Sequence, residues 1–140
     1  MNHIILVEDD YDDVYFFKSA NRNSASECEV SVFRDGAELL DFIYDESAYN
    51  SVGTPLIFLD LNLPKVSGLE VLSKLKQDGK LNKLPIIVYT TSTFQKDIEM
   101  AYELGAKSYI TKKASIELLS DLLTSANEYW FNYCELPKVH

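Results

Sequence analysis

The sequence predicts a doubly wound α/β fold, with five parallel strands in the order 2-1-3-4-5 and five helices covering both faces of the sheet. Short β-branched or apolar runs alternate with segments of helical periodicity along the whole chain. Strands that alternate with helices pair in parallel, and helices then cover both faces of the sheet. The length of 140 residues suits one domain with a sizeable core.

The individual elements follow from these patterns in chain order. We expect strands at His3–Val7, Glu29–Phe33, Leu56–Leu59, Ile86–Tyr89 and Ser108–Thr111. We expect helices at Tyr11–Arg22, Ala37–Tyr44, Gly68–Gln77, Phe94–Leu104 and Ile116–Tyr133. The polar segment Asp45–Thr54 is expected to be an irregular loop.

Capping residues indicate several of the helix starts. Asp10 is the expected N-cap of the first helix, and Asp12 and Asp13 then lie in its first turn, where negative charge is favourable. Two pairs have the spacing of capping boxes: Ser67 with Glu70, and Ser92 with Gln95.

The last helix has an apolar stripe and ends in an aromatic run. The stripe consists of Ile116, Leu119, Leu122, Leu123, Ala126 and Trp130. In the run "EYWFNYC" the consecutive aromatics at 129–131 cannot share one helix face, so at least one is expected to be exposed. Exposed aromatic side chains can mark an interface, so a homodimer through this helix is a hypothesis.

Charge and composition exclude several classes of protein. The net charge of −9 argues against binding to nucleic acid or to an anionic membrane surface. The N-terminal run "HIILV" lacks a preceding basic segment, and no apolar run reaches the roughly 20 residues that span a bilayer. Cys28 and Cys134 are too few for a disulfide framework. A cytoplasmic protein is expected.

The stretch "PLIFLDLNLPKVSG" places an aspartate, Asp60, directly after an apolar strand, where an uncompensated charge is unfavourable. Glu8, Asp9 and Asp10 follow the first strand in the same way. In a doubly wound sheet, ligands bind beyond the carboxyl ends of the strands, where strands 1 and 3 meet. The two acidic groups are therefore expected to converge there, beside the ends of strands 4 and 5 at Thr90 and Lys112.

The chemistry of this cluster indicates phosphoryl transfer. Carboxylates a few ångströms apart repel one another, and a hard divalent cation such as Mg²⁺ relieves that repulsion. A carboxylate, a metal, the Lys112 ammonium and the Thr90 hydroxyl together provide a nucleophile and stabilise charge on phosphoryl oxygens. Asp60 is then the nucleophile and becomes an aspartyl phosphate.

Four motifs in this order resemble the receiver domain of two-component response regulators, from Ile4 to about Trp130. The motifs are "ILVEDD", "LDLNLPKVSGLEVL", "IIVYTTS" and "GAKSYITK". The segments "VEDDYDD", "TTS" and "YITK" further resemble stand-alone receivers that serve bacterial phytochrome histidine kinases. The resemblance implies a flavodoxin-like fold, and a signalling function in which the protein catalyses only its own phosphorylation and dephosphorylation.

The resemblance also implies a role for each matching position. Asp60 is the implied phosphoacceptor; Asp9 binds Mg²⁺ directly, Glu8 through water, and Asn62 through its backbone carbonyl. Thr90 and Lys112 contact the phosphoryl group, and Tyr109 is the switch aromatic. Asn62, Thr91 and Ser92 occupy positions that tune the lifetime of the phosphate. The implied phosphoryl donor is a histidine kinase or a phosphotransfer protein.

Each of these residues also has a structural interpretation. Asp60 can be a polar residue that ends a buried strand, and Thr90 an ordinary strand residue. Asp10 or Glu8 can share the metal with Asp9. Lys112 can be a solvated surface charge, with Lys113 beside it as a competitor for its role, and Tyr109 can be an ordinary core residue. One departure stands out: Lys113 occupies a position where the family usually has proline.

We therefore expect a single receiver domain over residues 1–140, without an output domain, that signals through protein–protein contacts. One alternative is a pseudo-receiver that is not phosphorylated and serves as a scaffold. Another is a phosphatase that uses an aspartyl phosphate, but phosphatases of the haloacid-dehalogenase type have an aspartate where this chain has Asn62.

Overall fold

The computed structural model describes residues 2–137 and contains a five-stranded parallel sheet in the order β2-β1-β3-β4-β5. The predicted fold class and strand order are therefore confirmed. The strands are β1 (His3–Val7), β2 (Glu29–Phe33), β3 (Leu56–Leu59), β4 (Ile86–Thr90) and β5 (Ser108–Thr111). Only β4 differs from its predicted range, because it extends by one residue to Thr90.

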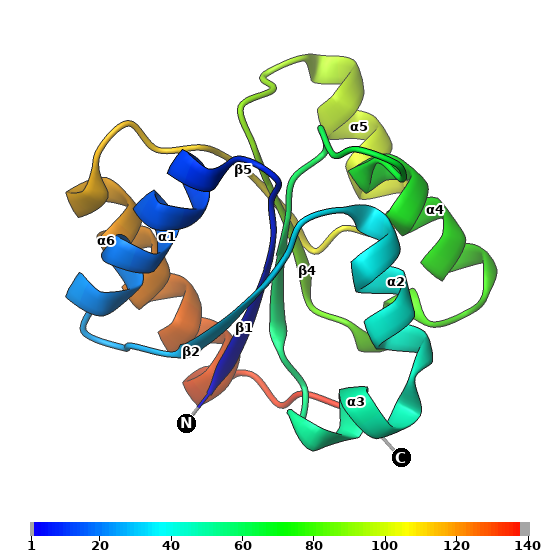
Figure 1. Cartoon of the computed structure of the whole chain (residues 1–140), viewed down its shortest axis with the longest axis horizontal. Coiled ribbons are helices and arrows are strands. Elements are labelled where there is room, and N and C mark those ends of the chain that lie inside the picture. Colours follow the sequence, from blue (N-terminus) through cyan, green and yellow to red (C-terminus); the bar gives the residue numbers. More distant parts are fainter. Residues whose placement is uncertain (1, 138–140) are drawn as a thin grey trace.

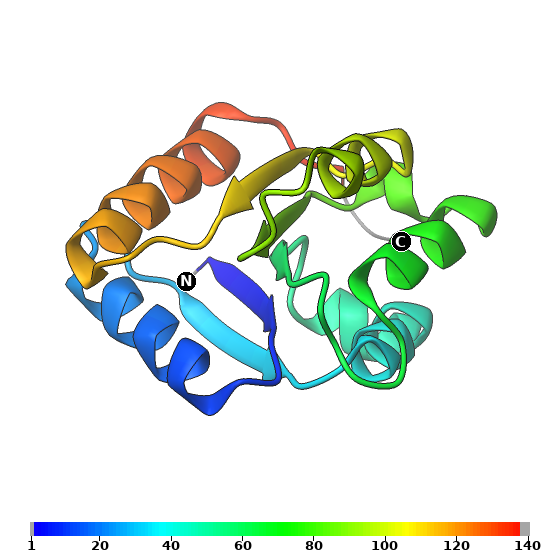
Figure 2. The same cartoon turned by 90° about the horizontal axis from the view of Figure 1, so that it is seen from above.

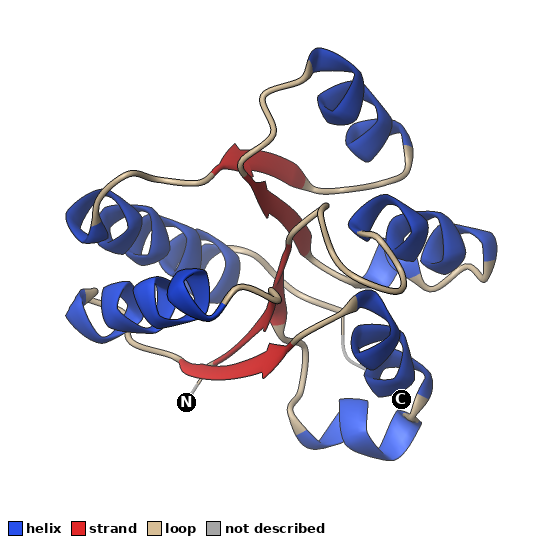
Figure 3. Ribbon diagram, turned by 45° about the horizontal axis from the view of Figure 1, so that its top comes forward, coloured by secondary structure: helices blue, strands red, loops and turns tan. Residues whose placement is uncertain are grey.

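Helices cover both faces of this sheet (Figures 1 and 3). The α-helices are α1 (Tyr11–Asn23), α2 (Gly36–Tyr44), α3 (Glu46–Ser51), α4 (Gly68–Gln77), α5 (Gln95–Glu103) and α6 (Ile116–Asn127). Helices α1 and α6 lie on one face, and α2, α4 and α5 on the other, so two apolar clusters form, one on each side of the strands. Within residues 2–137, no helix is long and apolar enough to cross a bilayer.

Helix α3 occupies part of the segment that the sequence predicted as an irregular loop, so that prediction was wrong for Glu46–Ser51. The Asp45 side chain accepts a hydrogen bond from the Ala48 N–H and so caps the helix. Tyr49 is buried against the aromatic ring of Phe42. A helix of six residues gains its stability mainly from such tertiary packing, which local sequence patterns do not reveal.

Two of the three predicted capping arrangements at helix starts are confirmed. Asp10 Oδ1 accepts the N–H groups of Asp12 and Asp13 at 2.8 and 3.1 Å, which confirms it as the N-cap of α1. The capping box between Ser67 and Glu70 is also present. The predicted box at Ser92 is wrong: Ser92 Oγ instead donates to Asp97 at 2.7 Å, and α5 begins after Phe94 without a side-chain cap.

The last helix is regular only as far as Asn127 and continues as a π-helical turn, Glu128–Tyr133. Within this turn Trp130 packs against the apolar cluster beneath α1 and α6, whereas Tyr129 and Tyr133 are exposed, as the predicted crowding requires. The chain then crosses to the α3 side of the molecule, where Thr54 Oγ1 donates to the Pro137 carbonyl at 2.6 Å (Figure 1).

Gly68, the first residue of α4, packs directly against the backbone that follows β3. A Cβ atom at Gly68 would lie 2.4 Å from the Asp60 carbonyl oxygen and 2.8 Å from Leu61 Cα. Because this contact is with backbone, we expect Gly68→Ala to lower the free energy of unfolding by about 1–3 kcal/mol in urea titrations. Ser73→Ala, at an exposed position of the same helix, is the control and should change stability by less than about 0.5 kcal/mol. Equal stability of the two variants would contradict the close packing.

Candidate functional site

The carboxyl ends of the strands meet at one edge of the sheet, which Figure 2 views from above. Val7 of β1 lies between Phe33 and Leu59 in the parallel register. The Glu8 N–H then donates to the Phe33 carbonyl at 2.9 Å, and the Asp60 N–H donates to the Val7 carbonyl at 3.2 Å. These bonds continue the ladder by one residue and place the Glu8 and Asp60 carboxylates side by side.

Asp60 is almost fully buried, with 5% of its surface exposed. Its Oδ2 accepts a hydrogen bond from Lys112 Nζ at 3.0 Å, and its Oδ1 accepts the N–H of Asn62 at 3.3 Å. The predicted compensation of the buried charge is thus provided by an ammonium and a backbone amide.

Lys112 links three carboxylates at the end of β5. Its Nζ lies 2.5 Å from Glu8 Oε1, 2.7 Å from Asp13 Oδ2 and 3.0 Å from Asp60 Oδ2. Sequence reasoning did not anticipate the contact to Asp13, which it placed only as a charge in the first turn of α1. The contact could have been expected from the position of Asp13 in the chain. Because α1 begins just after the end of β1, a side chain in its first turn can extend over the cleft.

The pKa values of this cluster reflect burial and proximity. Burial raises the pKa of the Glu8 carboxyl to about 7, and the charge of Asp60 adds to this, although the Lys112 ammonium acts in the opposite direction. Burial alone would lower the pKa of Lys112, but its hydrogen bonds to Asp13 and Glu8 and the charge of Asp60 raise it. Lys112 is therefore charged at neutral pH, whereas Glu8 titrates there.

The titration of Glu8 predicts how the stability of the metal-free protein depends on pH. The folded state binds this proton more tightly than the unfolded state, in which the carboxyl pKa is near 4.5. The bound proton therefore stabilises the folded state fully below pH 4.5, and this stabilisation is lost as the pH rises through about 7. The free energy of unfolding should fall by at most about 3 kcal/mol over this range.

Urea unfolding in EDTA at several pH values, beside the Glu8→Gln variant, measures this effect. The free energy of unfolding of the wild type should fall relative to that of the variant across this window, because the variant has no titrating group at position 8. Parallel pH profiles for the two proteins would contradict the assignment.

The cluster opens into an acidic cleft of about 640 Å³. Of the predicted site residues, those that line it are Glu8, Asp9, Asp60, Asn62, Thr91 and Lys112. Asp9 is exposed at the cleft. Among residues 2–137, no group of three or more acidic, His or Cys side chains is arranged to hold a metal ion.

The remaining predicted residues lie beside the cleft rather than in its lining. Thr90 is fully buried, and its Oγ1 has no hydrogen-bond partner in the described part of the chain. Tyr109 is half-buried and donates its hydroxyl to the Ser92 carbonyl at 2.9 Å. The sheet therefore brings a buried hydroxyl without a partner next to the Asp60 cluster, and Tyr109 contacts the loop that follows Thr90.

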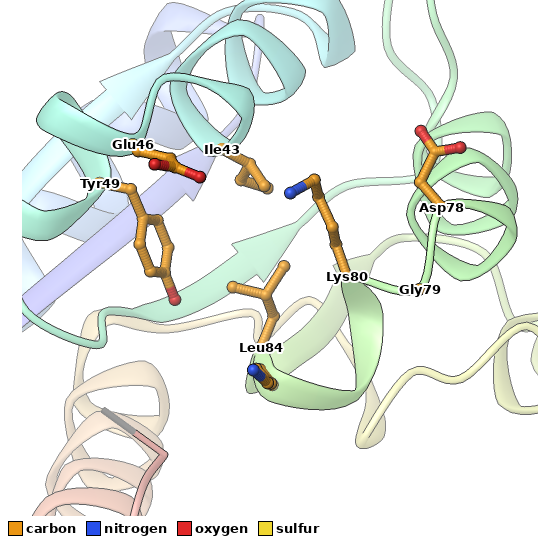
Figure 4. Close-up of a pocket in the computed structure, with 8 residues that line it drawn as sticks. Ile43, Glu46, Tyr49, Asp78, Gly79, Lys80 and Leu84 are labelled. Atoms are coloured by element: carbon orange, nitrogen blue, oxygen red, sulfur yellow. The ribbon is translucent and has the colours of Figure 1, made fainter. Parts of the chain in front are cut away.

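A separate pocket of about 230 Å³ lies at the opposite end of the sheet, near the start of β4 (Figure 4). Its walls include Ile43 and Leu84, and the Lys80 side chain extends across it. The Lys80 ammonium lies 5.2 Å from the centre of the Tyr44 ring. This pocket has no group of carboxylates bound to a common lysine, so the chemistry expected from the sequence belongs to the acidic cleft.

Comparison with known proteins agrees with this fold and cleft. The family model described as "response regulator receiver domain" matches residues 4–124. The response regulator Rcp1 of Synechocystis sp. is 34% identical over 135 residues, which cover 96% of this chain and 92% of Rcp1.

Solved structures of phytochrome-associated regulators are similar over nearly the whole chain. The phosphorylated cyanobacterial phytochrome response regulator RcpA has a TM-score of 0.82 and 38% identity, covering 97% of this chain and 98% of RcpA. The Mn²⁺-bound form of Rcp1 has a TM-score of 0.80 and 33% identity, covering 98% and 99% of the two chains.

The matching family model gives the class of protein, because receiver domains of response regulators are signalling domains rather than classical enzymes. The chain belongs to the response regulator receiver domain family of two-component systems. Among its relatives it resembles the stand-alone regulators associated with phytochromes, as the segments "VEDDYDD", "TTS" and "YITK" predicted.

Proposed function

We propose that this protein is a phosphorylation-dependent switch that accepts a phosphoryl group on Asp60 from a histidine kinase or a phosphotransfer protein. The observation that supports this most directly is the arrangement of Asp60: a buried carboxylate, bonded to Lys112, at the floor of an open acidic cleft. We infer that residues 1–140 act as one receiver domain in the cytoplasm.

In the proposed reaction, a carboxylate oxygen of Asp60 attacks the phosphorus of a phosphohistidine. The new P–O bond forms as the P–N bond breaks, and the imidazole leaves with its electron pair and takes up a proton. Lys112 already contacts Asp60 at 3.0 Å, so its ammonium can follow the negative charge onto the phosphoryl oxygens.

The cleft suits a divalent cation in its donor chemistry, because it offers carboxylate oxygens in an open, solvated setting. Asp9 and Asp60 would bind Mg²⁺ directly, with the Asn62 backbone carbonyl, and Glu8 would act through water. When bound, Mg²⁺ supplies positive charge that stabilises the phosphoryl oxygens. The Mn²⁺-bound form of the relative Rcp1 supports this assignment.

Switching is proposed to begin at Thr90. Its buried hydroxyl has no partner among residues 2–137, which is unfavourable, and a phosphoryl oxygen on Asp60 would provide an acceptor. Movement of Thr90 would shift the following loop, whose Ser92 carbonyl accepts the Tyr109 hydroxyl. The phosphorylated and unphosphorylated proteins would then differ in the surface around Tyr109, and a partner can bind one of them more tightly than the other. Asn62, Thr91 and Ser92 are proposed to tune the phosphate lifetime.

A homodimer through the last helix is proposed as a second interaction. Tyr129 and Tyr133 have 57% and 75% of their surface exposed near the end of this element. Light scattering over a concentration series, with and without phosphorylation, tests it. A monomer under every condition would contradict it.

Intact-protein mass spectrometry after incubation with Mg²⁺ and acetyl phosphate or phosphoramidate tests the proposed function, with EDTA as the control. A single Mg²⁺-dependent phosphoryl adduct is expected. If no adduct forms and beryllofluoride also fails to bind, the protein is a scaffold that is not phosphorylated. Sustained turnover of a generic phosphomonoester would instead indicate a phosphatase.

A further inference from the structure

Tyr89, on β4 directly before Thr90, has a buried hydroxyl that the proposed switch does not use. Only 5% of the residue is exposed, and it lies on the face of the sheet covered by α1 and α6. Its ring meets the rings of Phe17 and Phe58 edge-on, each with centroids 6.2 Å apart. The ring is therefore fixed on two sides by other aromatic residues.

The Tyr89 hydroxyl contacts the chain immediately after Lys112. It accepts a hydrogen bond from the Lys113 N–H at 3.2 Å. The preceding amide is bonded to the same strand, because the Lys112 N–H donates to the Thr90 carbonyl at 2.8 Å. The two amides that flank the Lys112 Cα atom are thus both bonded to β4, one through the backbone and one through a side chain.

This double attachment matters because β5 ends at Thr111 and α6 does not begin until Ile116. Lys112 therefore lies in a connection just past the end of β5, where only its own N–H continues the backbone hydrogen bonds to β4. Its Nζ nevertheless has to meet three carboxylates at 2.5–3.0 Å. A displacement of the backbone by about 1 Å would misplace the ammonium, and such misplacements reduce reaction rates strongly.

We propose that Tyr89 is a positioning residue for phosphoryl transfer: its hydroxyl fixes the Lys112–Lys113 segment, and thereby the Lys112 ammonium beside Asp60. The inference rests on the proposed function for its effect on rate, but not for the contact itself. The peptide bond between Lys112 and Lys113 is trans, as are all those in the described residues, so the bond from Lys113 does not depend on unusual backbone geometry.

A purely structural role for Tyr89 makes a different prediction. If the ring only filled the core, phenylalanine would serve equally well, and the hydroxyl would be dispensable. The chain contains a matched control: Tyr49 is also 5% exposed, but its hydroxyl has no hydrogen-bond partner among residues 2–137. Tyr89→Phe and Tyr49→Phe thus remove the same atom from equally buried sites at opposite ends of the molecule.

The first measurement is the rate of phosphorylation by phosphoramidate at fixed Mg²⁺, followed by intact mass. Tyr89→Phe should react about fivefold more slowly than the wild type, the effect of about one hydrogen bond, and Tyr49→Phe at the wild-type rate. Adding Tyr89→Phe to Lys112→Met should change the residual rate less than about 1.5-fold, because Tyr89 acts through Lys112. Thermal midpoints of all variants identify any general loss of structure.

The second measurement does not need phosphorylation. The NMR signal of the Lys112 ammonium, which three carboxylates hold in the wild type, should shift and broaden in Tyr89→Phe but stay unchanged in Tyr49→Phe. If the wild type accepts no phosphoryl group, the proposed function fails, and this signal alone decides whether Tyr89 positions Lys112. An unchanged ammonium signal in Tyr89→Phe, or a slowing that is equal with and without Lys112, would overturn the inference.

Discussion

Asp60→Asn should abolish the Mg²⁺-dependent phosphoryl adduct. The substitution preserves the size of the side chain and keeps an oxygen that can accept from Lys112 or from the Asn62 N–H, so the fold should remain intact. An amide, however, is a far weaker nucleophile than a carboxylate, because it has no negative charge and the lone pair of its nitrogen is delocalised into the carbonyl group. We expect a loss of at least about 100-fold in adduct formation, measured by intact mass.

Asp41→Asn is a suitable control for Asp60→Asn. It makes the same change in charge at an exposed position of α2, away from the cleft. Its adduct should form at the wild-type rate. An adduct of undiminished yield on the Asp60 variant would show that another carboxylate, such as Asp9 or Glu8, accepts the phosphoryl group, and the proposed role of Asp60 would be wrong.

The sheet could be predicted closely from sequence because its central strands, β1, β3 and β4, are buried on both faces. Leu56–Leu59 is fully buried, and such an apolar run, bounded by Pro55 and Asp60, has few alternative structures. The same pattern positions the cleft, since the residue after each strand necessarily lies at the edge of the sheet. Glu8, Asp60 and Lys112 were predicted to converge for that reason, and they do.

The features that sequence reasoning missed depend on contacts between residues more than four positions apart. Helix α3 forms where Tyr49 packs against Phe42, and Ser92 bonds Asp97 rather than capping α5. The contact of Asp13 with Lys112 joins residues 99 positions apart, and that of Lys113 with Tyr89 joins residues 24 positions apart. None of these has a local signature, because a capping or helical pattern describes neighbours within about four residues.

Lys112→Met should destabilise the metal-free protein strongly at alkaline pH. Methionine has a similar length but no charge, so three carboxylates lose their common partner. Two of these, Glu8 and Asp60, are buried, and removal of one partner from a buried ion pair typically costs about 3–5 kcal/mol. We expect a loss in this range at pH 8 in EDTA, measured by urea unfolding.

The pH dependence of that loss separates charge from packing. Burial and the charge of Asp60 already raise the pKa of Glu8, and without Lys112 this pKa should rise further. Near pH 5 Glu8 is then protonated in the folded variant, so the cluster has one uncompensated charge fewer. The loss in free energy of unfolding relative to the wild type should therefore be smaller at pH 5 than at pH 8. Lys113→Met, which removes a neighbouring charge but keeps the amide bonded to Tyr89, should change stability by less than about 1 kcal/mol at either pH. A deficit that is equal at both pH values would mean that Lys112 contributes packing rather than charge.

The Lys112 variant also tests whether the carboxylates bind a cation. The wild-type cluster is partly neutralised by Lys112, so a divalent cation enters a cleft in which an ammonium already contacts Glu8 and Asp60. With methionine at position 112, no ammonium competes with the cation for these carboxylates, so they should bind Mg²⁺ more tightly. Millimolar Mg²⁺ should therefore stabilise Lys112→Met more than it stabilises the wild type, in proportion to the tighter binding. Equal stabilisation of the two proteins would indicate that Mg²⁺ binds outside the reach of Lys112, at Asp9 and the outer acidic residues, rather than beside Asp60.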